Sequence, residues 1–243
     1  MSYKILEEKC YELLASADLA GFKSPYGELW SMFDGSGDQA ERMELAKSIA
    51  DVTYALGEYY HDRFCIFDLT GAYNDMNELA KEMPESEAAA LSCVMLAVGV
   101  FELKFHFREF ENVESYIDEL LPVTSRFEDN EEFTLYSAVC LCNLLQLCPY
   151  DMSVFIDCML SILDRIGELA GRFPGNADLQ LCCLRSYTFF LCYGKSRLKD
   201  EIFEEYYNRA ETAFIANEWI VDESALSDMR LELIKHGIGI RHY

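Results

Sequence analysis

Four side chains on two predicted helices have the types and spacing that could bind a metal ion. Glu58-x-x-His61 puts a carboxylate and an imidazole on one helix face, and Glu102 and His106 lie four residues apart on another. Di-iron helical bundles use Glu-x-x-His pairs together with further glutamates. A metal-assisted enzyme is therefore one hypothesis, provided that the two helices face each other. We favour the alternative, in which these residues are solvated side chains on amphipathic helices.

The ten cysteines are a second possible source of chemistry. The chain contains no Cys-x-x-Cys pair, and Cys140 and Cys142 point in different directions around a helix, so we do not expect a zinc site. A cysteine nucleophile needs a nearby histidine, and the chain has only four. Most of the thiols lie in apolar helical stretches, where free cysteine behaves as a small apolar side chain. With no apolar export signal, we expect free thiols, no cofactor and a cytoplasmic protein.

Composition argues against nucleic-acid and membrane partners. No phosphate-binding glycine loop and no Gly-x-Ser-x-Gly elbow occurs. The net charge of −23 repels phosphates and anionic membranes and attracts basic surfaces. The longest apolar stretch, residues 88–101, has the length of a core helix and not of a membrane span. The acidity is consistent with a basic partner, and equally with a role in solubility alone.

Helices must position the candidate side chains described above, and the sequence pattern that marks the helix ends recurs along the chain. A phrase that ends in a bulky apolar residue occupies residues 28–33, 78–83 and 168–173, with a weaker copy at 122–127. Its end residues are separated by 50, 44 and 46 positions, and 46 more reaches Trp219. A period near 45 residues indicates a stacked helical array.

The predicted helices alternate in character. Helices after each break are apolar nearly all round, as at residues 133–147 and 179–193, whereas those before each break are amphipathic. This alternation predicts an all-α fold, an α-solenoid of about four helical hairpins with terminal capping helices. The expected division is N-terminal capping helices at 1–37, helical repeats at 38–219 and a C-terminal capping helix at 220–243.

The segment Phe173-Pro174-Gly175-Asn176-Ala177-Asp178 resembles the turn between tetratricopeptide repeats, and Tyr187 falls where that family carries an aromatic residue. The chain departs from the family in its longer period and in having Gln180 at the usual tryptophan position. The resemblance implies that the first helix of each hairpin lines a groove. By position, the residues that would face a partner there are Arg185, Thr188 and Phe189.

An aromatic run, Phe101-x-x-x-Phe105-x-Phe107-x-x-Phe110, suggests a second contact surface. An exposed ring surrounded by glutamates suits a basic, partly apolar partner, and we select Phe105 and Phe107 as partner-binding candidates. The alternative is that these rings belong to the core.

The sequence as a whole favours a non-catalytic module that binds a protein or peptide partner. A partner with a basic surface is one version, as an inhibitor or immunity protein would have. The alternatives are the metal-assisted helical enzyme and a regulatory solenoid that senses a peptide or small ligand.

Overall fold

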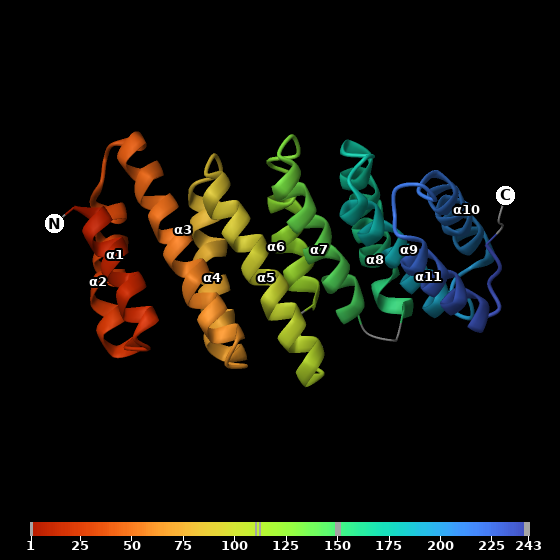
Figure 1. The fold of residues 1–243 in the computed structure, drawn as a ribbon, viewed down its shortest axis with the longest axis horizontal. Coiled ribbons are helices and arrows are strands. Elements are labelled where there is room, and N and C mark those ends of the chain that lie inside the picture. The colour runs from red at the N-terminus through yellow and green to blue at the C-terminus, as the bar shows by residue number, and fades with distance from the viewer. Residues whose placement is uncertain (1, 110, 112, 149–151, 241–243) are drawn as a thin grey trace. The chain divides into compact units, whose positions relative to one another are not determined.

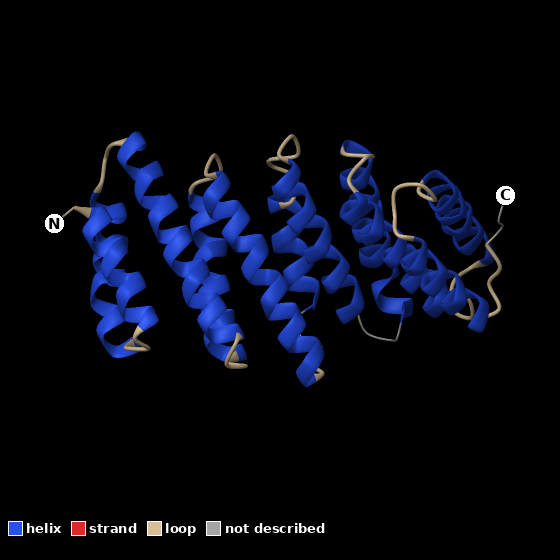
Figure 2. Ribbon diagram, in the orientation of Figure 1, coloured by secondary structure: helices blue, strands red, loops and turns tan. Residues whose placement is uncertain are grey.

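The computed structural model describes residues 2–109, 111, 113–148 and 152–240, and all regular structure in these residues is helical (Figure 2). The predicted all-α class is therefore confirmed. The chain divides into two compact units, Met1–Arg108 (unit 1) and Glu109–Tyr243 (unit 2). The helices are α1 Tyr3–Ala15, α2 Leu19–Gly35, α3 Gln39–His61, α4 Ile66–Glu82, α5 Glu87–Phe107, α6 Val113–Val123, α7 Glu131–Leu147, α8 Met152–Arg172, α9 Ala177–Gly194, α10 Asp200–Ala216 and α11 Glu223–Lys235.

Unit 1 consists of helices that pack on their neighbours in chain order (Figure 1). Helix α1 contacts α2 and α3, α3 contacts α4 and α5, and α4 contacts α5. Helices α3 and α5 approach closely at Gly57, where an added Cβ would lie 2.0 Å from Leu96 Cδ2. Buried aromatic rings fill the space between the helices, among them Phe22, Phe33, Tyr73 and Phe101.

Unit 2 repeats the same order of contacts. Helix α7 contacts α8 and α9, and α9 contacts α8, α10 and α11. Helix α6 packs on α7 and α8. Its core includes Phe133, Leu144, Ile162, Phe190 and Phe214. In unit 1 helices α1 and α3, and in unit 2 helices α7 and α9, therefore each contact the next helix and the next but one along the chain.

Five helices begin with the same polar device at nearly equal intervals. At the start of α3, α5, α7, α9 and α11, a side-chain oxygen accepts a hydrogen bond from a backbone N–H of the first turn. Such N-caps satisfy donors that the helix cannot pair internally. The capping residues are Asp38, Ser86, Asn130, Asn176 and Asp222, at intervals of 48, 44, 46 and 46.

Polar contacts within unit 2 join neighbouring hairpins across almost one period. Arg172 pairs with Glu128, 44 residues earlier. The cap residue Asn176 also donates to Glu131 Oε1 at 2.8 Å, 45 residues earlier. The predicted breaks coincide with the ends of the preceding helices, α2, α4, α6 and α8.

The structure changes two details of the expected helices. Helix α5 continues to Phe107 and by length and composition could cross a membrane, but 61% of its most apolar window is buried, as in the core helix of a packed protein. Trp219, the extrapolated fifth apolar position, lies in the turn after α10 and is 95% exposed.

Candidate partner-binding site

Three of the five predicted partner-binding residues line one pocket in unit 2. Arg185, Thr188 and Phe189 lie on α9, and they border a cavity of about 390 Å³. Helix α11 provides Asp228 and Glu232 to the same cavity. The remaining lining residues are Gln146, Cys192, Tyr193, Met229 and His236. We call this cavity the α9–α11 pocket.

The side chains of the α9–α11 pocket differ in how far they are already engaged. The buried Thr188 hydroxyl donates to Leu184 O at 2.8 Å, within its own helix. Glu232 pairs with Lys235 at 2.9 Å, and that hydrogen bond lowers the pKa of its carboxyl. Arg185 is exposed and forms no ion pair with the described residues. Its guanidinium is therefore available to a carboxylate or a carbonyl of a ligand.

All ten thiols are free, and burial disfavours nucleophilic chemistry at several of them. Burial raises the pKa of Cys183 and of Cys148 to about 12, and that of Cys192 in the pocket to about 11. A reactive cysteine requires the opposite shift, because the thiolate is the nucleophile. These thiols are consequently protonated at neutral pH.

The other two predicted residues lie in unit 1, on an exposed apolar surface. Phe105 and Phe107, near the end of α5, are 52% and 44% exposed, whereas Phe101 is buried. The ring of Phe64, in the turn between α3 and α4, lies 6.5 Å from the ring of Phe107. Phe67, three residues further along, is 86% exposed. We call these four exposed rings, Phe64, Phe67, Phe105 and Phe107, the phenylalanine patch; Phe64 and Phe107 lie in contact, and the other two are close to them in the chain. Phe110 of the aromatic run lies outside the described residues.

Backbone conformation at the phenylalanine patch is unusual. Phe64 has φ 56° and Arg108, directly after Phe107, has φ 59°. Bulky residues rarely adopt this left-handed conformation, and strained backbone tends to be kept at functional sites. Sequence reasoning missed Phe64 and Phe67; the available signal was two bulky rings, three residues apart, directly after the polar residues Asp62 and Arg63 that follow α3.

The candidate metal ligands are only partly brought together. Helices α3 and α5 do pack, and His61 Nε2 lies 3.2 Å from Glu102 Oε2. Glu58 instead accepts a hydrogen bond from Tyr54 at 2.8 Å, and the His106 ring lies 5.0 Å from the ring of Phe107. In the part of the chain that the structure describes, no group of three His, Cys, Asp or Glu side chains could hold a metal ion.

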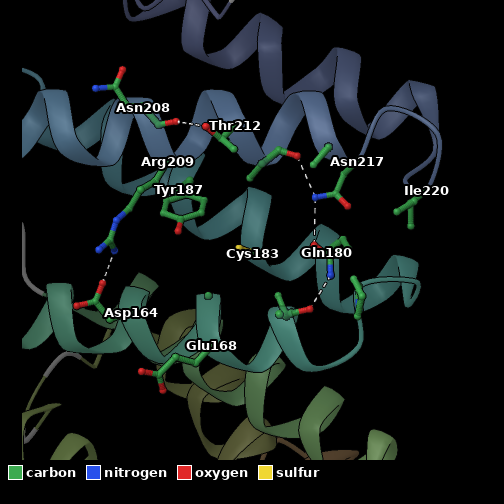
Figure 3. A pocket seen from close by; sticks show the side chains of 16 residues that line it. Asp164, Glu168, Gln180, Cys183, Tyr187, Asn208, Arg209, Thr212, Asn217 and Ile220 are labelled. Atoms are coloured by element: carbon green, nitrogen blue, oxygen red, sulfur yellow. Dashed lines mark hydrogen bonds and ion pairs between the residues drawn. The ribbon is translucent and has the colours of Figure 1, made fainter.

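A second cavity in unit 2, of about 880 Å³, lies between α8 and α10 with α9 as its floor (Figure 3). We call it the α8–α10 groove. At one end, Asp164 of α8 accepts hydrogen bonds from Tyr206 and Arg209 of α10. At the other end, Gln180 Nε2 donates to Ala170 O at 2.8 Å, and Asn217 Nδ2 donates to Gln180 Oε1 at 3.1 Å (Figure 3).

None of the groove residues was a predicted site residue. Gln180 and Asn217 are 37 residues apart, so the sequence gives no local sign that their amides meet. The one available signal was Gln180 itself, a polar residue in an otherwise apolar helix at a position where the resembled family has tryptophan.

Comparison of the chain with protein-family models, with curated proteins and with solved structures found no match.

Proposed function

We propose that this chain is a non-catalytic protein-interaction module that binds a partner protein through the phenylalanine patch. The observation that supports this proposal is the exposure of four phenylalanine rings on neighbouring segments of unit 1. Exposed apolar patches of this kind are typical of protein-binding surfaces, because their burial on association is favourable. Aromatic side chains are also enriched among the residues that contribute most to binding free energy.

The order of helix contacts in each unit is compatible with tetratricopeptide-like repeats. Such repeats stack hairpins so that each contacts its neighbours, and they function by presenting an extended surface. We infer an α-solenoid with capping helices at its ends. Under this proposal Arg185, Thr188 and Phe189 form a second contact point on the surface of α9.

The charge of the chain favours a partner with a basic surface. The exposed carboxylates Asp62, Asp68 and Glu102 lie within three residues of rings of the phenylalanine patch, and so do the exposed Arg63 and Arg108. The preference for a basic partner therefore comes from the net charge of −23. Acidic surfaces accelerate association with basic proteins and suppress acidic competitors. An inhibitor or immunity protein that masks a basic functional surface is a concrete version. We place it in the cytoplasm, where free thiols stay reduced.

The proposal is tested by affinity capture with matched variants. Immobilised wild-type protein and the double variant Phe67→Ser, Phe105→Ser are incubated with lysate of the source cells at low and high salt. The control Leu231→Ser, Ile234→Ser removes two exposed apolar side chains of α11 instead. We expect one protein to be retained at low salt by the wild type and the control only, with unchanged melting temperatures. Equal retention by the phenylalanine variant would refute the role of the patch.

The α9–α11 pocket supports a second candidate, a regulatory protein that senses a peptide or small ligand. Its volume of about 390 Å³ lies in the range of small-molecule sites, roughly 300–1,000 Å³. Arg185 on one wall and Asp228 on the other favour a ligand with both charges. A ligand panel in a thermal-shift assay tests this candidate: a rise in melting temperature that Arg185→Ala abolishes supports it.

A further inference from the structure

Helix α11 has apolar side chains on two of its faces. Leu226, Met229 and Leu233 are buried, and α11 packs on α9. Leu231 and Ile234 are instead 56% and 61% exposed. The last helix of a helical stack needs a polar outer face to stay soluble. The second apolar face of α11 therefore indicates a further contact.

Earlier helices of unit 2 bury the position that Ile234 occupies. Ile234 lies twelve residues after the cap of its helix, and so do Cys142 in α7 and Thr188 in α9. Cys142 and Thr188 are each only 7% exposed. Each of their helices has a later one beside it, since α9 packs on α7 and α11 packs on α9. The twelfth position is thus one where helices meet, and in α11 it is apolar and open.

The exposed face of α11 has the spacing of a two-helix contact. Ser224, Ser227, Leu231 and Ile234 are all exposed and follow one another at intervals of three, four and three residues. These are the intervals of the stripe through which two helices pack in a coiled coil. The two serines are small and allow a neighbouring helix to approach. A single helix therefore fits this face.

The charged residues beside this stripe suit an antiparallel copy of the same helix. Asp228 and Lys235 are exposed and lie two turns apart, directly after the stripe residues Ser227 and Ile234. Two helices related by a twofold axis that crosses them run antiparallel, so Asp228 of one copy faces Lys235 of the other. A parallel copy would place like charges together. Lys235 also pairs with Glu232 of its own helix at 2.9 Å, and this exposed contact is weak.

We propose that two copies of this chain form a homodimer through α11. Leu231 and Ile234 of each copy pack on those of the other, and Asp228 pairs with Lys235 across the contact. The apolar area is small beside the roughly 1,200–2,000 Å² of a stable interface, and the net charge of −23 opposes association. The expected Kd is therefore roughly 10–100 μM. This contact needs no other protein and goes beyond the proposed function.

Sedimentation equilibrium of the purified full-length chain, at about 10–300 μM, tests the dimer. The variant Leu231→Ser, Ile234→Ser is compared with Phe67→Ser, Phe105→Ser, which removes two exposed apolar side chains of unit 1. We expect the wild type and the phenylalanine variant to approach twice the monomer mass as concentration rises. The α11 variant should raise the Kd about tenfold or more while keeping its helicity in circular dichroism. A wild type that stays monomeric, or equal association of all three proteins, would overturn the inference.

Charge reversal tests the antiparallel arrangement. Asp228→Lys and Lys235→Asp should each weaken the dimer, because each places like charges across the contact. The double variant should recover most of the affinity, since it restores opposite charges with their signs exchanged. Loss of affinity in the double variant equal to the sum of the single losses would contradict the arrangement. The purified protein is used alone, so a dimer without a captured partner would leave this inference intact while the proposed function fails; a captured partner with a monomeric chain would mean the reverse.

Discussion

Gly57 of unit 1 and Gly171 of unit 2 differ in what surrounds them. A Cβ added to Gly57, where α3 and α5 approach, would lie 2.0 Å from Leu96 Cδ2. A Cβ added to Gly171, which borders the α8–α10 groove, would meet no atom within 4 Å. Gly57 is therefore required by packing within the chain, and Gly171 is not.

The units also differ in how they use charge, although both are acidic. Unit 1 has 19 acidic and 9 basic residues, and unit 2 has 24 and 11, so their net charges are −10 and −13. In unit 2 the nearly buried Arg165 joins α8 to Glu128 and to the backbone of Thr124. Unit 1 instead exposes the phenylalanine patch. Charge pairing therefore contributes to the interior contacts of unit 2. Both units expose large apolar side chains, but the exposed phenylalanine rings named here belong to unit 1.

Alkaline pH should distinguish the units most strongly. Burial raises the pKa of several thiols and phenols, so the stability they provide is complete below about pH 9 and is lost as pH rises towards 12. Each pKa unit corresponds to about 1.4 kcal/mol, so two thiols raised from 9.0 to about 12 approach the net stability of a domain. Unit 2 has more of these groups: Cys148, Cys182, Cys183, Cys192 and Tyr187.

Circular dichroism between pH 8 and 12 follows the loss of helix in the whole chain. In the variant Trp219→Phe, emission of Trp30 reports on unit 1 alone, because the chain has two tryptophans. We expect helicity to fall before Trp30 emission changes. If helicity and Trp30 emission changed at the same pH, or if the spectrum at pH 12 were unchanged, unit 2 would not be the more alkali-sensitive unit.

Replacement of Arg165 by leucine should destabilise unit 2 by about 2–3 kcal/mol, since it removes the largely buried guanidinium that bonds Glu128 and the Thr124 carbonyl and leaves Glu128 with Arg172 alone. The control is Arg209→Leu, whose side chain is 43% exposed; its loss should cost at most about 1 kcal/mol. Urea unfolding followed by circular dichroism measures both values. Equal effects would mean that burial does not distinguish the two ion pairs.

Gly57→Ala should destabilise unit 1 by about 1–3 kcal/mol, because the new methyl group would overlap Leu96 in a packed core. The change is read from Trp30 emission during urea unfolding. The double variant Gly57→Ala, Leu96→Ala should recover part of the loss if the overlap is the cause.

Gly171→Ala has the smallest expected effect, and it should stabilise the protein where the other substitutions destabilise it. Alanine is the better helix former and meets no neighbour here, so unit 2 should gain about 0.5–1 kcal/mol. A loss of stability, measured by urea unfolding followed by circular dichroism, would show that Gly171 has a structural role.

Much of the helical framework could be predicted because its signals are local. The apolar stretches at residues 133–147 and 179–193 predicted α7, Glu131–Leu147, and α9, Ala177–Gly194, closely. The periodicity of a helix explains why Arg185, Thr188 and Phe189, one turn apart, line a single pocket. Their role in binding stays a prediction.

The rest depends on tertiary packing, which no local pattern encodes. Asp228 and Glu232 complete the α9–α11 pocket only because α11 packs on α9. The groove network depends on Asn217 meeting Gln180 from another helix. Exposure of Phe105 beside a buried Phe101, on one helix face, likewise depends on where the neighbouring helix ends.

The evenly spaced caps have a consequence for how this chain can change in length. Each capped helix carries its own start signal, and the bonds that join hairpins reach back by about one period. Duplication or deletion of a segment of about 46 residues would therefore bring equivalent partners back into register. Insertions of other sizes would misalign them, so growth or shortening of this protein is expected to occur in whole hairpins.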